Sequence, residues 1–380
     1  MESETRVSNR ATERTHTRNV LWISNETPDQ HGQGGQRRQY FQIRALVDAG
    51  HRVHVMSLAG GQDDTSLKLV ATVDRFRGQL MRGVRNPMAR LTFSRALRSD
   101  RYDAVVVSHI ESWRWVGHAA RRHRPPTLVD LHNVYVGWYS QIGGSEADER
   151  EALGLLERVL ESSDGVSVCS RSELERLPED PPLAERLVVP HGVDPDEWPD
   201  RLGPGQSSAP YVALFGSWTW IPNLRGLEWF ESTVWPAVMS QVPTARALVA
   251  GSGLGGRQAK VPGISYVGRA EDLSAFLGRA ATVAIPVRSG VGASVKYAEA
   301  LASGAPVIAT RDAASAHPGF GRYVSDEPDV WIRHLVNHLT EPAGWPTPER
   351  ERALTELSWS AVSRPLDEWL CAQQPRGRAS

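Results

Sequence analysis

The sequence predicts an α/β protein of two doubly wound, Rossmann-like domains that face each other across a cleft. Short apolar runs alternate with segments of helical period, and the alternation occurs in two series. A stretch rich in proline and glycine, Pro190–Pro210, separates the series and is typical of a linker. Strands that alternate with helices form parallel sheets covered on both faces. Because such sheets bind ligands at the carboxyl ends of their strands, we expect the active site between the domains.

The first series predicts a domain over residues 19–190, preceded by a polar segment, residues 1–18, that we expect to be a disordered arm. Helices are expected over Arg37–Ala49, Trp113–Arg122 and Glu146–Glu161, where apolar residues recur with a helical period. Strands are expected at the continuous apolar runs Val20–Ile23, Val53–Leu58, Ala104–Val107, Thr127–Leu131, Gly165–Val168 and Leu187–Val189.

The second series predicts a linker over residues 191–209, a domain over residues 210–355, and a C-terminal helix and tail over residues 356–380. Helices are expected over roughly Leu224–Met239, Ala270–Arg279 and Val295–Ala302. Strands are expected at Tyr211–Phe215, Ala245–Ala250, Ser265–Val267, Thr282–Val287 and Pro306–Ala309.

Composition excludes several classes of protein. The formal net charge of −1 is spread evenly along the 380 residues, which argues against a nucleic-acid partner. No run approaches the ~18 apolar residues of a membrane-spanning helix, and the charged first residues lack the apolar region of a signal peptide. The only cysteines, Cys169 and Cys371, form no CxxC pair, so we expect no structural zinc site and a cytoplasmic location. Composition leaves the oligomeric state undetermined.

Glycine-rich segments at strand ends are the first candidate ligand sites. Gly34 and Gly35 precede an expected helix, where they would let a diphosphate approach the helix N–H groups. A flexible loop without a ligand is the alternative. Gly251–Gly256 matches the pattern GxGxxG, but Pro262 follows too soon for the helix that a dinucleotide site requires. We therefore expect no nicotinamide cofactor there.

The segment Pro286–Thr310 carries the strongest chemical signal. A glycine-rich loop leads to Ser294, the expected N-cap of a helix, and Lys296 lies in the first turn of that helix, where a cation suits a diphosphate. Glu299 lies three residues further on the same face, where a carboxylate suits the two hydroxyls of a ribose. The alternative is an exposed ion pair. Lys296 is one of only three lysines among 43 basic residues, which favours a function.

Two features of the first domain permit more than one interpretation. His132 directly follows an apolar run, so it is either a ligand contact or a structural histidine, and Asp130 either orients its ring or caps a loop. The segment Arg75–Arg101 holds eight arginines interleaved with apolar residues. It could contact an anionic membrane surface or an anionic acceptor, but the arginine-rich background favours a solvated face.

Several motifs, in this order, resemble family 4 glycosyltransferases. Val188–Asp194 resembles the VxPNGVD linker of that family, and Phe215–Trp218, followed by Pro222-Asn223, Trp229-Phe230 and Trp235-Pro236, resembles the opening of its donor domain. Glu299–Val307, with the sequence EALASGAPV, matches the signature EAxAxGxPV. The spacing from Gly290 through Lys296 to Glu299 resembles a subgroup with GxGxxxKxxEA in place of a double-glutamate motif.

The resemblance implies a GT-B fold and retaining transfer of a sugar from a nucleotide-sugar co-substrate to an acceptor hydroxyl, without an obligatory metal. It implies catalytic roles for three residues: His132 would approach the donor sugar, Lys296 would supply the phosphate cation, and Glu299 would hold the ribose. It assigns donor binding to Gly34, Gly35, Gly216, Ser217, Gly268, Arg269, Arg288, Gly290, Gly292, Ala293, Ser294 and Val295.

The sequence departs from the family pattern at two places. The first glutamate of the family's pair falls on Val291, and Ser217-Trp218 stands where the family has a GRL segment followed by lysine. Because the missing carboxylate is where sugar hydroxyls are usually read, two alternatives stay open: a nucleotide-sugar epimerase of the same fold, and a catalytically silent nucleotide-sugar binder. Donor base, donor sugar and acceptor are not determined by the sequence.

Overall fold

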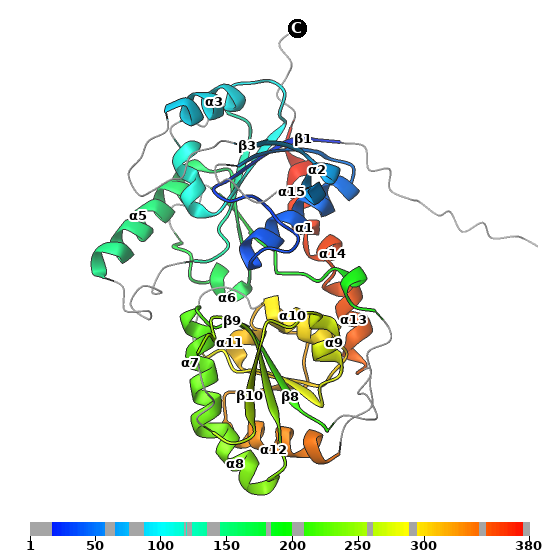
Figure 1. Ribbon diagram of the computed structural model, residues 1–380. Helices are drawn as coiled ribbons and strands as arrows, with labels where there is room; N and C mark the ends of the chain where they lie inside the picture. The colour runs from blue at the N-terminus through cyan, green and yellow to red at the C-terminus, as the bar shows by residue number, and fades with distance from the viewer. Residues whose placement is uncertain are drawn as a thin grey trace, which may run out of the picture.

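The computed structural model describes residues 17–57, 65–75, 87–117, 119, 124–134, 145–179, 184–199, 209–256, 261–288, 295–341 and 347–374. These residues form two α/β units, one above the other in Figure 1. Each unit is built on one parallel sheet, in agreement with the predicted fold class. In the part of the chain that is described, no helix has the length and apolar character needed to cross a bilayer.

The first sheet has seven parallel strands in the order β3-β2-β1-β4-β5-β6-β7. Their bounds are β1 Asn19–Ser24, β2 Arg52–Ser57, β3 Thr72–Arg75, β4 Ala104–Ser108, β5 Thr127–Asp130, β6 Gly165–Val168 and β7 Glu185–Val188. The strand order reverses between β1 and β4, whose last residues, Ser24 and Ser108, are paired in register. The carboxyl ends of these two strands are therefore the topological switch point, where open α/β sheets bind ligands.

Helices cover both faces of this sheet, and two apolar clusters pack beneath them. The helices are α1 Gly34–Asp48, α2 Thr65–Val70, α3 Pro87–Leu97, the 3₁₀ helix η1 Ile110–Trp115, α5 Glu146–Ser162 and α6 Arg171–Leu174. The prediction of an α-helix over Trp113–Arg122 is wrong for its first residues, which belong to the 3₁₀ helix η1. Trp113 and Trp115 are buried against the sheet in η1, which a turn ends at Val116.

The second sheet has six parallel strands in the order β10-β9-β8-β11-β12-β13, so its switch point lies between β8 and β11. The strands are β8 Val212–Ser217, β9 Ala247–Ser252, β10 Ile264–Gly268, β11 Thr282–Ile285, β12 Val307–Ala309 and β13 Tyr323–Val324. The helices are α7 Ile221–Trp229, α8 Trp235–Gln241, α9 Leu273–Gly278, α10 Val295–Ala302, α11 Arg311–Ala314 and α12 Pro328–Thr340. A π-helical turn, Phe230–Val234, joins α7 to α8.

Three C-terminal helices bring the chain back to the first unit, as the red segment in Figure 1 shows. They are α13 Glu349–Glu356, α14 Trp359–Val362 and α15 Arg364–Ala372. The first of them packs against α10, whereas Trp359 and Trp369 are buried in the apolar cluster beneath α1. Phe41 of α1 stacks on Trp359 with ring centroids 5.5 Å apart. The C-terminal helices therefore belong to the cores of both units.

Arg18 corrects the expected extent of the disordered arm. It is buried, and its guanidinium donates hydrogen bonds to the carbonyls of Leu370, Cys371 and Gln373 at the end of α15, over 3.2, 2.9 and 2.6 Å. These carbonyls end a helix and need partners from outside it. The rest of the expected arm, residues 1–16, lies outside the described residues.

The segment Arg75–Arg101 is only partly described, because residues 76–86 lie outside the described ranges. Within α3, Phe93 and Leu97 are fully buried in the core of the first unit, whereas Leu91 is exposed. Part of the apolar face that could contact a membrane is therefore used in packing.

Candidate functional site

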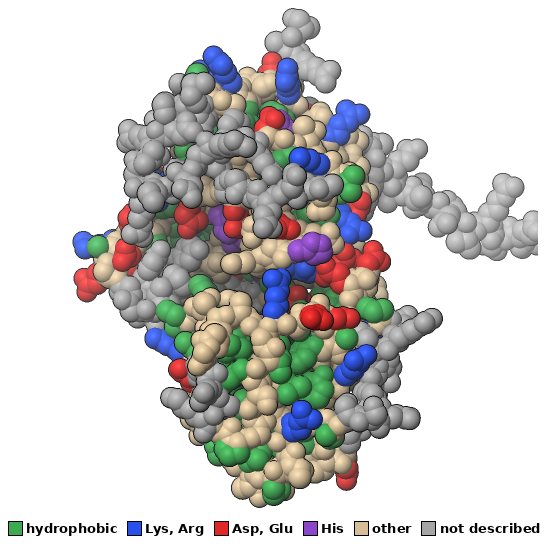
Figure 2. Space-filling view, viewed as in Figure 1, with side chains coloured by type: hydrophobic (Ala, Val, Ile, Leu, Met, Phe, Trp, Pro, Cys, Tyr) green, Lys and Arg blue, Asp and Glu red, His purple; other side chains and the backbone are tan. Residues whose placement is uncertain are grey.

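The carboxyl ends of the two sheets meet where α1 and α10 begin. A Cβ atom placed on Gly34, the first residue of α1, would lie 3.8 Å from Cγ2 of Val295, the first residue of α10. Basic, acidic and histidine side chains gather along this band between the units in Figure 2. We call this region the domain junction. It brings together Gly34, Val295, Lys296 and Glu299, which the sequence analysis selected separately.

The start of α1 is a loop with little space for a side chain at Gly35. A Cβ on Gly35 would lie 2.9 Å from Oε1 of Glu26 and 3.1 Å from Cε1 of His109. Gln36 fixes the loop, because its amide accepts a hydrogen bond from Gln33 N–H over 3.1 Å and donates one to the carbonyl of Thr27 over 3.1 Å. The helix N-terminus is thereby held open toward the junction, where its N–H groups suit an anion.

His132 lies just after β5 but is buried, with 4% of its surface exposed. Its Nε2 lies 2.8 Å from Ser108 Oγ and 3.2 Å from Asp130 Oδ2. Burial, aided by the neighbouring His109, lowers the pKa of His132 to about 4. The ring is therefore neutral at pH 7, so it can offer a hydrogen bond but no charge to a ligand.

The sequence left open whether Asp130 orients the His132 ring or caps a loop. In the structure Asp130 contacts the ring of His132. It also accepts hydrogen bonds from Arg38 Nε over 2.9 Å, Arg38 Nη2 over 2.7 Å and Ser167 Oγ over 2.7 Å. Burial acts to raise the pKa of Asp130, but Arg38 and His132 outweigh it and hold that pKa well below its usual value. Asp130 is thus a buried carboxylate that orients both side chains.

Sequence reasoning missed a second histidine, His109, which directly follows β4. Its ring lies beside that of His132, with centroids 3.6 Å apart, and its Nε2 lies 2.6 Å from Oε1 of Glu26. Burial acts to raise the pKa of Glu26, but the hydrogen bond with His109 helps to hold that pKa below its usual value. The position immediately after an apolar strand, which singled out His132, was equally present at His109.

On the opposite side of the junction, Lys296 is held by an amide. Its Nζ donates to Oδ1 of Asn223 over 2.5 Å, and Nδ2 of Asn223 donates to the carbonyl of Ser217 over 2.8 Å. Gly216 has a φ of +151°, and a Cβ there would lie 3.3 Å from Nζ of Lys296. Burial lowers the pKa of Lys296 to about 7, although the Glu299 charge opposes the shift. Asn223 is therefore a site residue that the chemical reading of the sequence did not select.

Glu299 lies one turn beyond Lys296 on α10. Burial raises its pKa to about 7, opposed by Arg37 and Lys296 and assisted by Glu197. Arg37 of α1 pairs with Glu197 of the linker over 2.6 Å, so a residue of the first unit and one of the linker both act on Glu299. At pH 7 the two functional groups of α10 are close to their midpoints of titration, and a bound anion would change their charge.

The remaining predicted donor-binding residues lie around the second sheet. Ser217 is exposed at the end of β8, and Gly268, with a φ of +72°, and Arg269 are exposed at the end of the edge strand β10. Arg288 lies over the ring of Trp229, 4.6 Å from its centroid. The loop residues Gly290, Gly292, Ala293 and Ser294 lie outside the described residues, as does Val291.

The GxGxxG stretch has a packing explanation. A Cβ on Gly251 would lie 1.8 Å from the carbonyl oxygen of Gly216, and one on Gly253 would lie 2.7 Å from Cγ2 of Thr219. The glycines thus let the end of β9 pack closely against the loop after β8.

Among the described residues, His51, Asp367 and Cys371 are close enough to be considered as a metal site. His51 Nδ1 accepts a hydrogen bond from Arg18 N–H over 3.1 Å, so the neutral ring carries its proton on Nε2. Nε2 lies 2.8 Å from Asp367 Oδ1, to which it donates. Because both ring nitrogens of His51 form hydrogen bonds within the protein, no lone pair is left for a metal. We therefore interpret the cluster as structural.

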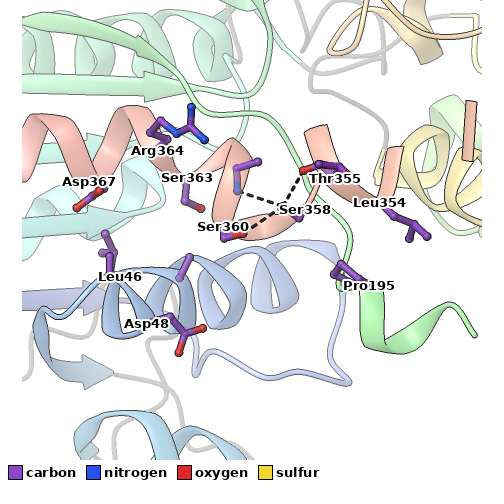
Figure 3. A pocket seen from close by; sticks show the side chains of 13 residues that line it. Leu46, Asp48, Pro195, Leu354, Thr355, Ser358, Ser360, Ser363, Arg364 and Asp367 are labelled. Carbon is purple, nitrogen blue, oxygen red and sulfur yellow. Dashed lines mark hydrogen bonds between the residues drawn. The ribbon is translucent and has the colours of Figure 1, made fainter. Parts of the chain in front are cut away.

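A cavity of about 620 Å³ lies at the opposite end of α1 from the junction (Figure 3). It is bounded by the last turns of α1, by Pro195 of the linker and by the helices α13–α15, and its lining includes Ser358, Ser363 and Arg364. None of the junction residues lines it. The candidate functional site is therefore the domain junction.

Comparisons with known proteins agree with this geometry. The family model described as Glycosyltransferase Family 4 matches residues 32–197, and the model described as Glycosyl transferases group 1 matches residues 209–340. Among curated protein sequences, none matches the chain.

Solved structures of glycosyltransferases share the fold at low identity. A sucrose-phosphate synthase from Thermosynechococcus elongatus is 15% identical over 93% of this chain and 98% of that chain, with a TM-score of 0.67. The Anabaena protein HepE, in complex with UDP and glucose, is 15% identical over 94% and 100%, with a TM-score of 0.68. WaaG, a glycosyltransferase involved in lipopolysaccharide biosynthesis, is 15% identical over 93% and 100%, with a TM-score of 0.63.

The two family models follow one another along the two α/β units, and full-length structural matches give the same two-domain arrangement. The chain belongs to the family 4 glycosyltransferases and has the GT-B fold.

Proposed function

We propose that this glycosyltransferase moves a sugar, with retention of anomeric configuration, from a nucleoside-diphosphate sugar to an acceptor hydroxyl. The observation that carries the proposal is the position of Lys296. It lies in the first turn of α10 and is oriented by Asn223, and its neighbour Val295 approaches Gly34, where α1 begins. A cation in the first turn of one helix, with a second helix N-terminus nearby, suits a diphosphate.

Solved structures of a similar protein also support a nucleotide-sugar donor. HepE was crystallised with UDP and with UDP-glucose, and it shares the fold over nearly the whole chain. The pair Lys296 and Glu299 fits such a donor, with the lysine at the phosphates and the glutamate at the ribose hydroxyls one turn deeper.

The chemical step needs charge stabilisation at the leaving group. As the bond between the anomeric carbon and the phosphate oxygen breaks, negative charge grows on the diphosphate and positive charge on the sugar. Lys296 and the N–H groups at the starts of α1 and α10 stabilise the diphosphate. The acceptor oxygen forms the new bond on the same face, and its proton passes to the departing phosphate oxygen. Configuration is thereby retained, and no separate protein base is needed.

We further propose that no divalent metal is needed, because Lys296 and the helix N-termini supply the positive charge that a metal would otherwise provide. Transfer should then persist in EDTA at an unchanged rate. A rate restored only by added Mg²⁺ or Mn²⁺ would contradict this.

The first test is ligand-induced thermal stabilisation by UDP, GDP, thymidine diphosphate and UDP-glucose. A ligand at one hundred times its Kd stabilises the native state by about 2.7 kcal/mol. Lys296→Ala should weaken the response, whereas Lys68→Ala, an exposed lysine of α2, should not. If no nucleotide raises the melting temperature of the wild-type chain, the proposal fails.

Turnover separates the proposal from its two alternatives. Removing one preorganised stabilising group from a developing oxyanion costs about 10²- to 10³-fold in kcat, so we expect that loss for Lys296→Ala. An epimerase would change the donor sugar in the absence of any acceptor, which NMR of the nucleotide sugar detects. A silent binder would show binding and no product.

A further inference from the structure

The wall of the junction opposite Lys296 carries a histidine–carboxylate pair that the proposed donor contacts do not use. Glu26 follows β1 and His109 follows β4, so the pair spans the topological switch point of the first sheet. His109 Nε2 lies 2.6 Å from Glu26 Oε1, and the same carboxylate oxygen accepts a hydrogen bond from Gln39 Nε2 over 3.1 Å.

This pair remains open to a ligand, unlike the neighbouring His132. The side chains of His109 and Glu26 are 20% and 35% exposed, whereas those of His132 and Asp130 are 3% and 1% exposed. Gly35, at the start of α1, contacts the pair directly, since a Cβ there would lie 2.9 Å from Glu26 Oε1. His109 and Glu26 therefore stand beside the helix N-terminus that we assign to the diphosphate.

Both histidines have a strained backbone conformation that contacts with their surroundings maintain. His109 and His132, with φ of +66° and +57°, are the only non-glycine residues with positive φ in the described part of the chain. Such conformations are unfavourable and persist only where the surroundings enforce them. The enforcing contacts are the hydrogen bond from His109 N–H to the carbonyl of Asp130, 3.0 Å, and the ring contact between the histidines, 3.6 Å between centroids.

The proton positions follow from the carboxylate. An ionised Glu26 only accepts hydrogen bonds, so Nε2 of His109 is the protonated nitrogen and donates to it. In the neutral ring Nδ1 then carries a lone pair, and no group in the described residues donates to it. The exposed surface of the pair thus presents a nitrogen lone pair and a carboxylate oxygen. Both accept hydrogen bonds.

We propose that His109 Nδ1 binds the reacting hydroxyl of the acceptor, with Glu26 as the positioning residue that fixes the ring tautomer. This inference rests on the proposed function, and it assigns the acceptor a hydroxyl group that donates a hydrogen bond at the point of transfer. His109 supplies orientation only, because the proton of the hydroxyl leaves with the phosphate oxygen.

Two substitutions at one position separate binding from structure. His109→Gln places an amide nitrogen near the former Nε2, so it keeps the contact with Glu26 and loses the Nδ1 acceptor. His109→Asn places an amide oxygen near the former Nδ1, and asparagine tolerates positive φ well. If the acceptor hydroxyl binds Nδ1, the asparagine variant should retain more turnover than the glutamine variant. A merely structural histidine that serves to hold Glu26 predicts the reverse order.

The assay uses the full chain, the nucleotide sugar that stabilises it, and water as the acceptor, so that donor hydrolysis is measured. We expect His109→Gln and Glu26→Ala to lower turnover about 10- to 100-fold, since misplacing a reactant by about 1 Å costs about that much. The donor Kd should change less than twofold. His54→Gln is the matched control, because His54 lies in the middle of β2 and pairs with Asp74 of the edge strand β3 over 3.0 Å.

A direct readout is the tautomer itself. In ¹⁵N-histidine-labelled protein, His109 should show a protonated Nε2 and an unprotonated Nδ1, and Glu26→Ala should abolish this preference, while Glu26→Gln, which still accepts a hydrogen bond, should keep most of it. Unchanged turnover in both His109 variants, or loss of donor affinity in step with turnover, would overturn the inference. Loss of all nucleotide binding in the wild-type chain would instead refute the proposed function.

Discussion

Donor affinity should be greatest near pH 7 and should decline on both sides, for reasons that can be assigned to two residues. In the unliganded junction, burial places the pKa of Lys296 and that of Glu299 each at about 7. A diphosphate beside Lys296 favours the ammonium form and raises the lysine pKa in the complex. Ribose hydroxyls that donate to Glu299 favour the carboxylate form and lower the glutamate pKa in the complex.

The pKa shifts of Lys296 and Glu299 make donor affinity depend on pH in opposite directions. A pKa raised on binding gives affinity that is complete below about pH 7 and is lost as the pH rises above it. A pKa lowered on binding gives affinity that is complete above about pH 7 and is lost as the pH falls below it. About half of the lysine is protonated at pH 7 and about one eleventh at pH 8, while the ionised fraction of Glu299 rises from about one half to about ten elevenths. Affinity should therefore fall about threefold between pH 7 and pH 8. Between pH 7 and pH 6 affinity should also fall about threefold, because Glu299 becomes largely protonated while Lys296 becomes fully charged.

Calorimetry in buffers of different ionisation enthalpy measures the protons exchanged on binding. A nucleotide sugar is the appropriate ligand, because a free nucleoside diphosphate has a terminal phosphate that titrates near pH 6. At pH 8 the wild-type complex should take up nearly one proton, at pH 6 it should release nearly one, and the sign should change near pH 7.

Variants assign each limb of this profile to its residue. Lys296→Met should abolish the uptake at pH 8, and Glu299→Gln should abolish the release at pH 6. Because Lys296 helps to keep Glu299 ionised, the release in Lys296→Met should extend to higher pH. Proton uptake at pH 8 that persists in Lys296→Met would refute the assignment, since the titrating group would then be another residue.

Three further predictions concern single contacts. Glu299→Ala should lower both donor affinity and kcat, and an unchanged donor titration would show that the carboxylate does not hold the ribose. Arg38→Met should cost about 3–5 kcal/mol of unfolding free energy in denaturant titrations, because it leaves the buried Asp130 carboxylate without its cation. Arg44→Ala, which removes a more exposed pair with Asp194, should cost about 1 kcal/mol or less, and equal losses would contradict the distinction. Trp369→Ala, in the core shared with α1, should cost about 3–5 kcal/mol, whereas the exposed Trp220→Ala should cost about 0.5 kcal/mol or less.

Much of the fold could be predicted from the sequence because parallel strands are buried on both faces. Strands such as β1, β4 and β11 are fully or almost fully buried and read as continuous apolar runs. The strands that the analysis missed, β3 and β13, are short and lie at sheet edges, so they lack that pattern. The helix α12 was also missed, although Pro328 at its first position and its buried face were available as signals.

The candidate site was predicted in part, and its omissions have a common physical reason. Lys296 and Glu299 stand in one helix, so their relation is local and could be read from their spacing. Asn223 acts on Lys296 from α7, and Arg37 acts on Glu299 from the first unit, and no local pattern records such contacts. His109 was missed for the same reason, since the pair that it forms with Glu26 joins residues at the ends of two different strands.

The helix α1 connects catalysis with the arrangement of the two units. Its first residue, Gly34, lies in the junction opposite Val295, and Arg37, one turn later, pairs with Glu197 of the linker. Its Phe41 stacks on Trp359, next to the bridge between Val193 and Ser358 where the chain crosses between the units. A rotation of the second unit about this crossing would move α10 away from Gly34 while leaving the packed middle of α1 in place. We therefore expect donor binding to draw the starts of α1 and α10 together, since a diphosphate gains most when both helix N-termini reach it.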